Sequence, residues 1–91
     1  MATIEELETQ ARIGVDWPEV LGNFDCDAGR AEIKRIAVID DARERATAIE
    51  AAIDVAMRGE PFSDLDAGSS EWSRVREALR DSLLAEAESA S

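Results

Sequence analysis

A long stretch without helix-breaking residues constrains this chain more than any other feature. Residues 29–58 contain no proline and no glycine after Gly29. The apolar residues of this stretch recur at alternating intervals of three and four, in the order Ile39, Ala42, Ala46, Ile49, Ile53 and Ala56. This is the spacing of one face of an α-helix, so we expect a single helix over residues 29–58, about 45 Å long at ~1.5 Å per residue.

A second apolar stripe runs along the same predicted helix. It consists of Val38, Ala48, Ala52 and Val55. Together the two stripes make an apolar face wider than one neighbouring helix can cover, so we expect the helix to be packed on two sides. Part of the second stripe would then remain open as a surface for a partner. At 91 residues the chain is in a size range where oligomerisation often adds stability, so a homo-oligomer is one alternative.

Three further helices are predicted from capping residues and apolar periodicity. A hydroxyl or carboxylate side chain followed three residues later by Glu forms a capping box at a helix start. Such pairs are Thr3 with Glu6 and Asp16 with Glu19. The predicted helices cover residues 4–13, 17–21 and 70–87.

The fold class follows from these elements. No segment alternates between apolar and polar residues over a useful length, so we predict no β-sheet. We expect residues 1–91 to form a single all-α domain, a small helical bundle. In it the long central helix forms an antiparallel hairpin with the C-terminal helix, and the N-terminal helix packs across that hairpin.

A short acidic phrase occurs twice. Residues 25–32 read DCDAGRAE and residues 64–71 read DLDAGSSE, and each copy lies just after a phenylalanine, Phe24 or Phe62. Paired aspartates before a glycine suggest a calcium-binding EF-hand loop, but the glycine is at position five instead of six and position twelve is apolar. We interpret both copies as acidic beginnings of helices, and we predict no metal site and no cofactor.

The charge of the chain is unevenly distributed. The formal net charge is −11, with −6 in residues 1–28, zero in residues 29–59 and −5 in residues 60–91. Contacts with phosphates need clustered Lys and Arg, so direct binding to nucleic acid or to an anionic membrane is disfavoured. The natural complement is a protein with a basic surface, and the acidic residues that we expect near such a partner are Asp25, Asp27, Asp64 and Asp66.

The residue types offer little for catalysis. The chain has no His, and the thiol of Cys26 lies between Asp25 and Asp27, whose charges disfavour the thiolate. Neither a glycine-rich phosphate loop nor a serine nucleophile motif is present, so we predict that the protein is not an enzyme. The opening residues suggest no secretory signal, and no apolar run has the ~20 residues of a membrane span.

These observations favour a non-catalytic protein that acts through protein contacts, at the second stripe and the acidic residues. A more specific alternative is a phage-type inhibitor, similar to anti-CRISPR or anti-restriction proteins, whose acidic residues mimic nucleic acid and occupy a basic groove. Such small inhibitors are similar to this chain in size and acidity.

Four short segments carry a resemblance to a known family. They are residues 3–7 (TIEEL), 10–13 (QARI), 51–53 (AAI) and 58–62 (RGEPF). They resemble the start of the first helix and the end of the long helix in phage head-tail connector proteins, over about a quarter of the chain. The chain departs from that family in its inserted segment 16–27 and in lacking aromatic residues near the end of the long helix. The resemblance implies a virion ring subunit, and we expect the protein either in the cytoplasm of a host cell or in a virion.

Overall fold

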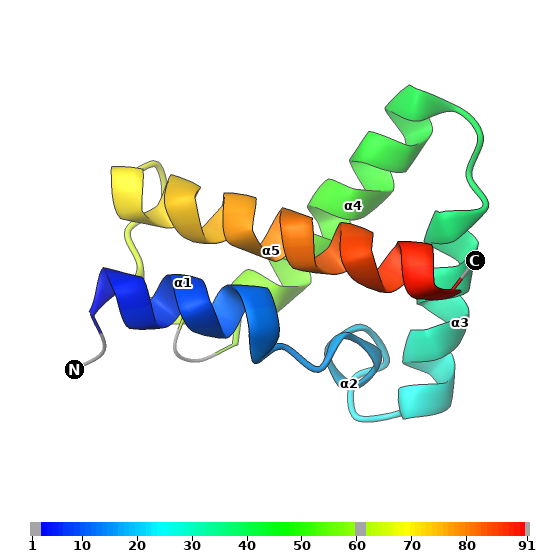
Figure 1. The fold of residues 1–91 in the computed structure, drawn as a ribbon, viewed down its shortest axis with the longest axis horizontal. Coiled ribbons are helices and arrows are strands. Elements are labelled where there is room, and N and C mark those ends of the chain that lie inside the picture. The colour runs from blue at the N-terminus through cyan, green and yellow to red at the C-terminus, as the bar shows by residue number, and fades with distance from the viewer. Residues whose placement is uncertain (1–2, 60–61, 91) are drawn as a thin grey trace.

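The computed structural model describes residues 3–59 and 62–90, so Glu60 and Pro61 of the quoted motif lie outside the described residues. All regular secondary structure in this part of the chain is helical, which confirms the all-α class (Figure 1). The elements are α1 (Ile4–Ile13), α2 (Trp17–Leu21), α3 (Cys26–Ala37), α4 (Ala42–Met57), η1 (Phe62–Asp64) and α5 (Ser70–Ala90).

The prediction of one helix over residues 29–58 is wrong, because residues 38–41 form a non-helical link between α3 and α4. The Asp41 carboxylate accepts a hydrogen bond from the backbone N–H of Glu44 at 2.9 Å and so caps a new helix. Val38 and Ile39, at the start of the link, are β-branched, and Asp40 and Asp41 at its end also have a low helix propensity. The apolar spacing continues across the link, but the capping residue stops one helix and starts the next.

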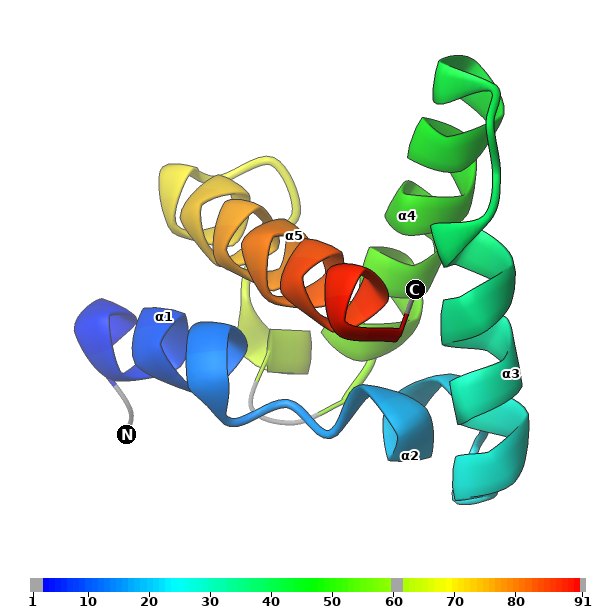
Figure 2. The same ribbon diagram turned by 45° about the vertical axis from the view of Figure 1, so that its right-hand side comes forward.

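The link also reverses the direction of the chain. In Figures 1 and 2, α3 rises toward the link and α4 descends from it, and the two helices diverge as they leave it. The first residues of α4, from Ala42 to Thr47, include none that is buried, and Ile49 is the first buried residue of that helix. The beginning of α4 therefore projects from the body of the protein.

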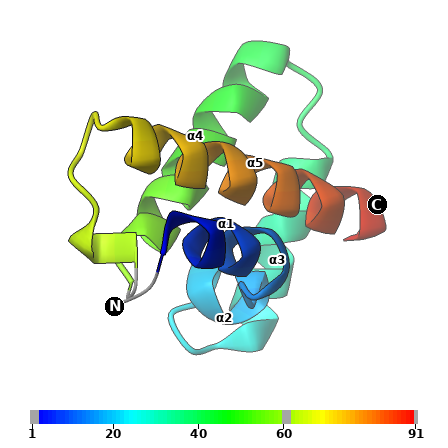
Figure 3. The same cartoon turned by 60° about the vertical axis from the view of Figure 1, so that its left-hand side comes forward.

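Helix α5 is the element around which the others pack. α1 runs beside it in the same direction, and α3 contacts its C-terminal half. The expected antiparallel hairpin is not confirmed, because α4 crosses α5 in all three views (Figures 1, 2 and 3). The core is aliphatic with two aromatic side chains, and its largest fully buried residues are Trp17, Ile36, Ile53, Val75, Leu79 and Leu83.

Every helix has one buried face and one exposed face. The hydrophobic effect of burying the Ile and Leu side chains, about 1.5–3 kcal/mol for each, supplies most of the favourable free energy of folding. Among residues 3–59 and 62–90, no helix combines the length and apolarity that a bilayer crossing requires.

Candidate functional site

The predicted second stripe does not form one surface. Ala52 is buried in the core and Ala48 is half-buried, whereas Val55 is 38% exposed on α4. Val38 is 72% exposed, but it lies in the link between α3 and α4. Because the predicted helix is divided, these positions do not share one helix face, and only Val38 and Val55 offer exposed apolar side chains.

The four predicted acidic residues are exposed, but they lie in two separate places. Asp25 and Asp27 are at the start of α3, whereas Asp64 and Asp66 are in η1 and the loop before α5, on the other side of the molecule in Figure 1. The Asp25 carboxylate caps α3, accepting from the N–H groups of Asp27 and Ala28 at 3.1 and 3.2 Å. The structure therefore brings Asp25 and Asp27 together but not the two pairs.

The turn between α2 and α3 holds an exposed aromatic residue on a strained backbone. The N–H of Asp25 donates to the carbonyl of Gly22 at 3.0 Å, which closes a four-residue turn. Its central residues, Asn23 and Phe24, have positive φ angles of 49° and 74°. Asn tolerates this region, but for a bulky residue it costs about 1–2 kcal/mol. The Phe24 side chain is 82% exposed, so burial in the core does not offset this cost.

Phe24 borders a groove of about 450 Å³ between the α2–α3 turn and the end of α4. Val20 and Phe24 lie on the first wall, and Val55 and Ala56 lie on the second. One acidic and one basic residue complete the charged part of the lining, Glu19 on α2 and Arg58 after α4. We call this depression the Phe24 groove; it can accept an apolar side chain with a charged group beside it.

The wall that carries Phe24 is held by two close packing contacts. Trp17 is fully buried, and its Nε1–H donates to Ser82 Oγ at 2.9 Å, which fixes α2 against α5. Gly29 of α3 faces the backbone of α2, where a Cβ atom would lie 1.7 Å from the carbonyl oxygen of Pro18. Only glycine permits this approach, so the two helices that flank the turn pack closely against each other.

The surroundings of Phe24 are acidic. Residues 14–29 include four acidic residues and no basic residue, and all four acids are exposed: Asp16, Glu19, Asp25 and Asp27. The next residue along the chain, Arg30, donates from Nη2 to Asp27 Oδ1 at 2.6 Å. That hydrogen bond, with smaller contributions from charges that include Asp16, raises the pKa of Arg30 above its ordinary value. On its α2–α3 side, the groove therefore carries an excess of negative charge.

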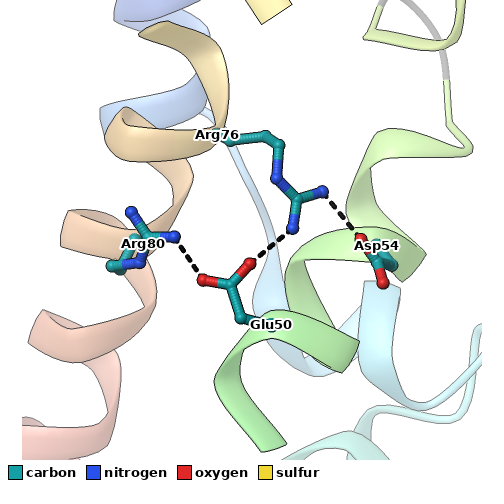
Figure 4. A network of polar contacts seen from close by, with 4 residues as sticks. All are labelled: Glu50, Asp54, Arg76 and Arg80. Atoms are coloured by element: carbon teal, nitrogen blue, oxygen red, sulfur yellow. Dashed lines mark hydrogen bonds and ion pairs between the residues drawn. The ribbon is translucent and has the colours of Figure 1, made fainter. Parts of the chain in front are cut away.

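A second charged cluster joins α4 to α5 (Figure 4). Arg76 donates to Glu50 at 2.6 Å and to Asp54 at 2.7 Å, and Arg80 also pairs with Glu50. The Arg76 guanidinium lies over the ring of Trp72, 4.9 Å from its centroid. A hydrogen bond from Arg80, assisted by Arg76, lowers the pKa of Glu50. Burial lowers the pKa of Arg76, but its two ion pairs outweigh burial and raise it. With every charge partnered, the cluster is suited to hold two helices together.

Sequence reasoning missed both Phe24 as a site residue and this cluster. The signal for Phe24 was Gly22-Asn23 directly before it, two residues that favour a turn with positive φ. The signal for the cluster was an acidic pair four residues apart on one helix and a basic pair four residues apart on another. The part of the chain that the structure describes contains no group of three or more His, Cys, Asp or Glu side chains placed to hold a metal ion.

No protein-family model matches the chain, and no matching curated protein or solved structure was found. The resemblance to head-tail connector proteins therefore stays a prediction. A functional proposal for this protein is therefore based on the geometry and the charge of its own surface.

Proposed function

We propose that the protein is a non-catalytic binding module that recognises a partner protein through the Phe24 groove. The observation that carries this proposal is an aromatic side chain that is exposed and held at φ 74°, in a turn where glycine would be free of strain. Strain of this kind occurs preferentially where a side chain must be presented for function. Aromatic residues are also enriched at the centres of protein interfaces.

The expected partner presents an apolar side chain flanked by Lys or Arg. The apolar side chain would enter between Phe24 and Val55, and the basic groups would face the acidic residues of α2 and the start of α3. Charge complementarity of this kind mainly accelerates association, and it weakens as salt screens the charges. Binding should therefore combine an apolar anchor with strong dependence on ionic strength.

Inhibition by mimicry of nucleic acid stays a prediction. A mimic needs a continuous acidic face, but the start of α3, with Asp25 and Asp27, lies on the other side of the molecule from η1 and the loop before α5, with Asp64 and Asp66 (Figure 1). On the side of the Phe24 groove, such a role would depend on Asp16, Glu19, Asp25 and Asp27. Replacing these four residues by Asn or Gln would abolish binding of a mimic, but would only slow association of a partner that is anchored by Phe24. The connector hypothesis depended on one long helix, and it gains no support from the separate α3 and α4.

A site-specific photo-crosslinking experiment tests the proposal. A photoreactive phenylalanine analogue is placed at position 24 in cells that produce the protein, and irradiation captures whatever lies in the groove. The matched control carries the same analogue at Ile13, which is 83% exposed at the end of α1. We expect position 24, but not position 13, to cross-link to one defined protein with a basic surface.

The captured protein is then purified and its dissociation constant measured. Phe24→Ser should weaken binding by about 30-fold, since truncation of an interface anchor costs about 2 kcal/mol. Asp25→Asn with Asp27→Asn should reduce the association rate and the salt dependence; Asn still caps α3, so the fold is retained. Equal cross-linking from positions 24 and 13, or unchanged affinity for Phe24→Ser, would reject the proposal.

A further inference from the structure

We propose that two copies of this chain can exchange halves at the α3–α4 link and form a domain-swapped dimer. In the dimer, residues 38–41 become helical and join α3 and α4 into one continuous rod. The part of one copy before the link packs against the part of the other copy after it. The partner is a second copy of the chain, and each Phe24 groove would re-form between copies, because its two walls lie on opposite sides of the link.

The first supporting observation is how little holds the link in its bent form. The side-chain hydrogen bond at the link is the Asp41 cap on the N–H of Glu44 at 2.9 Å. On the α3 side, the N–H groups of Val38 and Ile39 both donate to the carbonyl of Ile36, the second at a long 3.3 Å. Val38 is 72% exposed and Ile39 is only half-buried, so core packing contributes little.

The sequence of the link is also compatible with a helix. Residues 30–58 contain neither proline nor glycine, and the intervals of three and four between apolar residues continue across the link from Ile36 through Ile39 to Ala42. A continuous helix would pair the backbone groups that the bend leaves without helical partners. The same chain segment thus has a bent form, stabilised by a cap, and a straight form, stabilised by helix continuity.

The second supporting observation is the pattern of contacts on the two sides of the link. α3 and α4 contact each other little; α3 packs mainly on α2 and α5, and α4 packs on α5 and α2. Interactions between the two halves include the hydrogen bond from Trp17 to Ser82. They also include an ion pair in which Arg74 Nη2 lies 2.5 Å from Glu8 Oε1. The geometry of this ion pair does not meet that of a hydrogen bond. Every one of these contacts re-forms between copies in a swapped dimer, so the balance between the two forms is decided at the link.

The charge distribution favours this location for new contacts between copies. Each chain carries a net charge of −11, which opposes association, but residues 29–59 contain six basic and six acidic residues. In the dimer the two links meet near the two-fold axis, where the exposed Val38 side chains can pack together. The acidic segments keep the neighbours that they have in the monomer, so the new interface forms in the neutral part of the chain.

Link variants provide the first test, with mass measured by light scattering coupled to size-exclusion chromatography over a range of concentrations. Asp41→Ala removes a cap that stabilises only the bent form. Formation of one dimer straightens two bent links, so the effect of the cap counts twice, and the dissociation constant of the dimer should fall about 30-fold. Asp40→Ala raises helix propensity without touching the cap, and it should lower the constant about five-fold. A Gly-Ser-Gly-Ser insertion between Ile39 and Asp40 should give a folded monomer at every concentration.

Charge-swapped chains provide the second test. Glu8→Arg and Arg74→Glu each place like charges together within a monomer. When the two variants are mixed and refolded, a swapped heterodimer restores an opposite-charge pair in both of its lobes, whereas an ordinary surface dimer restores none. We expect the mixture to form heterodimers and each variant alone to melt at a lower temperature than the mixture.

Three results would overturn the proposal. The first is that the wild type, Asp41→Ala and Asp40→Ala are each monomeric at every concentration. If Asp41→Ala fails to fold, the wild type and Asp40→Ala decide the outcome. The second is an insertion variant that dimerises as tightly as the wild type. The third is a refolded mixture of Glu8→Arg and Arg74→Glu that contains no heterodimer.

Discussion

The two copies of the repeated acidic phrase share most of their letters but have different structures. In the first copy, Asp25 caps α3 and Gly29 lies within that helix, buried against α2. In the second copy, Asp64 belongs to η1, and Gly68 lies in the loop before α5 with φ 85° and no atom within 4 Å of where a Cβ would be placed. The first glycine is required for close packing, and the second is required for its backbone angle.

The residues that follow the glycine in each copy explain where each helix begins. The first copy has Arg30-Ala31 after its glycine, and neither residue is a good N-cap, so Asp25 caps the helix, which starts at Cys26. The second copy has Ser69 at the corresponding position, and its hydroxyl accepts from the N–H of Trp72 at 3.1 Å. The start of α5 is thereby moved to Ser70. A repeated phrase therefore predicts a capping region but not the register of the helix that follows.

The largest expected difference between the copies is in their glycines. Gly29→Ala places a methyl group 1.7 Å from the Pro18 carbonyl oxygen, so backbone must move, and we expect the free energy of unfolding to fall by about 4 kcal/mol. Gly68→Ala meets no atom and should cost only about 1 kcal/mol, because of its positive φ. Urea denaturation of both variants measures the difference, and equal losses would contradict the packing role of Gly29.

The phenylalanines that precede the copies should differ next. Phe62 is buried in the core beside α4, and Phe62→Ala should lower the free energy of unfolding by about 3 kcal/mol. Phe24→Ala removes an exposed side chain and should change it by less than about 0.5 kcal/mol. Thermal melts followed by circular dichroism compare the two; a strong loss in Phe24→Ala would mean that the aromatic ring is structural.

The first aspartates of the copies should show a smaller contrast. Asp25→Ala removes the cap of α3 and should cost about 1 kcal/mol of unfolding free energy, with recovery in Asp25→Asn. Asp64→Ala removes an exposed carboxylate that caps no helix and should stay within about 0.5 kcal/mol of the parent. Chemical denaturation of the three variants, with Ser69→Ala as the matching cap deletion for α5, would show whether capping is divided as described.

The smallest effect has the opposite sign. Phe24→Gly relieves a positive φ, so it should raise the free energy of unfolding by about 0.5 kcal/mol, after the entropy that glycine adds to the unfolded chain is subtracted. The same variant should lose binding of the cross-linked partner. A variant that is both less stable and fully active would show that Phe24 serves folding and not recognition.

Local capping chemistry made much of the helical structure predictable. The capping boxes at Thr3 and Asp16 predicted where α1 and α2 start, because the side chain that satisfies the first N–H groups also fixes the beginning of a helix. The division between α3 and α4 was missed although Asp41 and Glu44 carry the same signal. There the apolar spacing continued through the link. Such a periodicity predicts which face of a helix can be buried, but it does not predict whether the chain reverses direction.

The candidate site was less predictable, since it depends on contacts between distant segments. Val55 was expected at a binding surface and is partly exposed at the Phe24 groove, but Ala52 of the same stripe is buried. Nothing in the residues around Phe24 indicates that α4 would end beside it. That proximity comes from the burial of Trp17 and from the reversal at the α3–α4 link, and both are properties of the folded chain.

The placement of the two tryptophans gives the protein its own optical reporters. The chain has no tyrosine, so its ultraviolet emission comes almost entirely from Trp17 and Trp72. The Trp17 indole is sealed from water between α2 and α5, whereas Trp72 is partly open to solvent beneath the Arg76 guanidinium. Replacing either indole by Phe leaves one fluorophore, so loosening of α2 and separation of α4 from α5 can be timed independently in unlabelled protein.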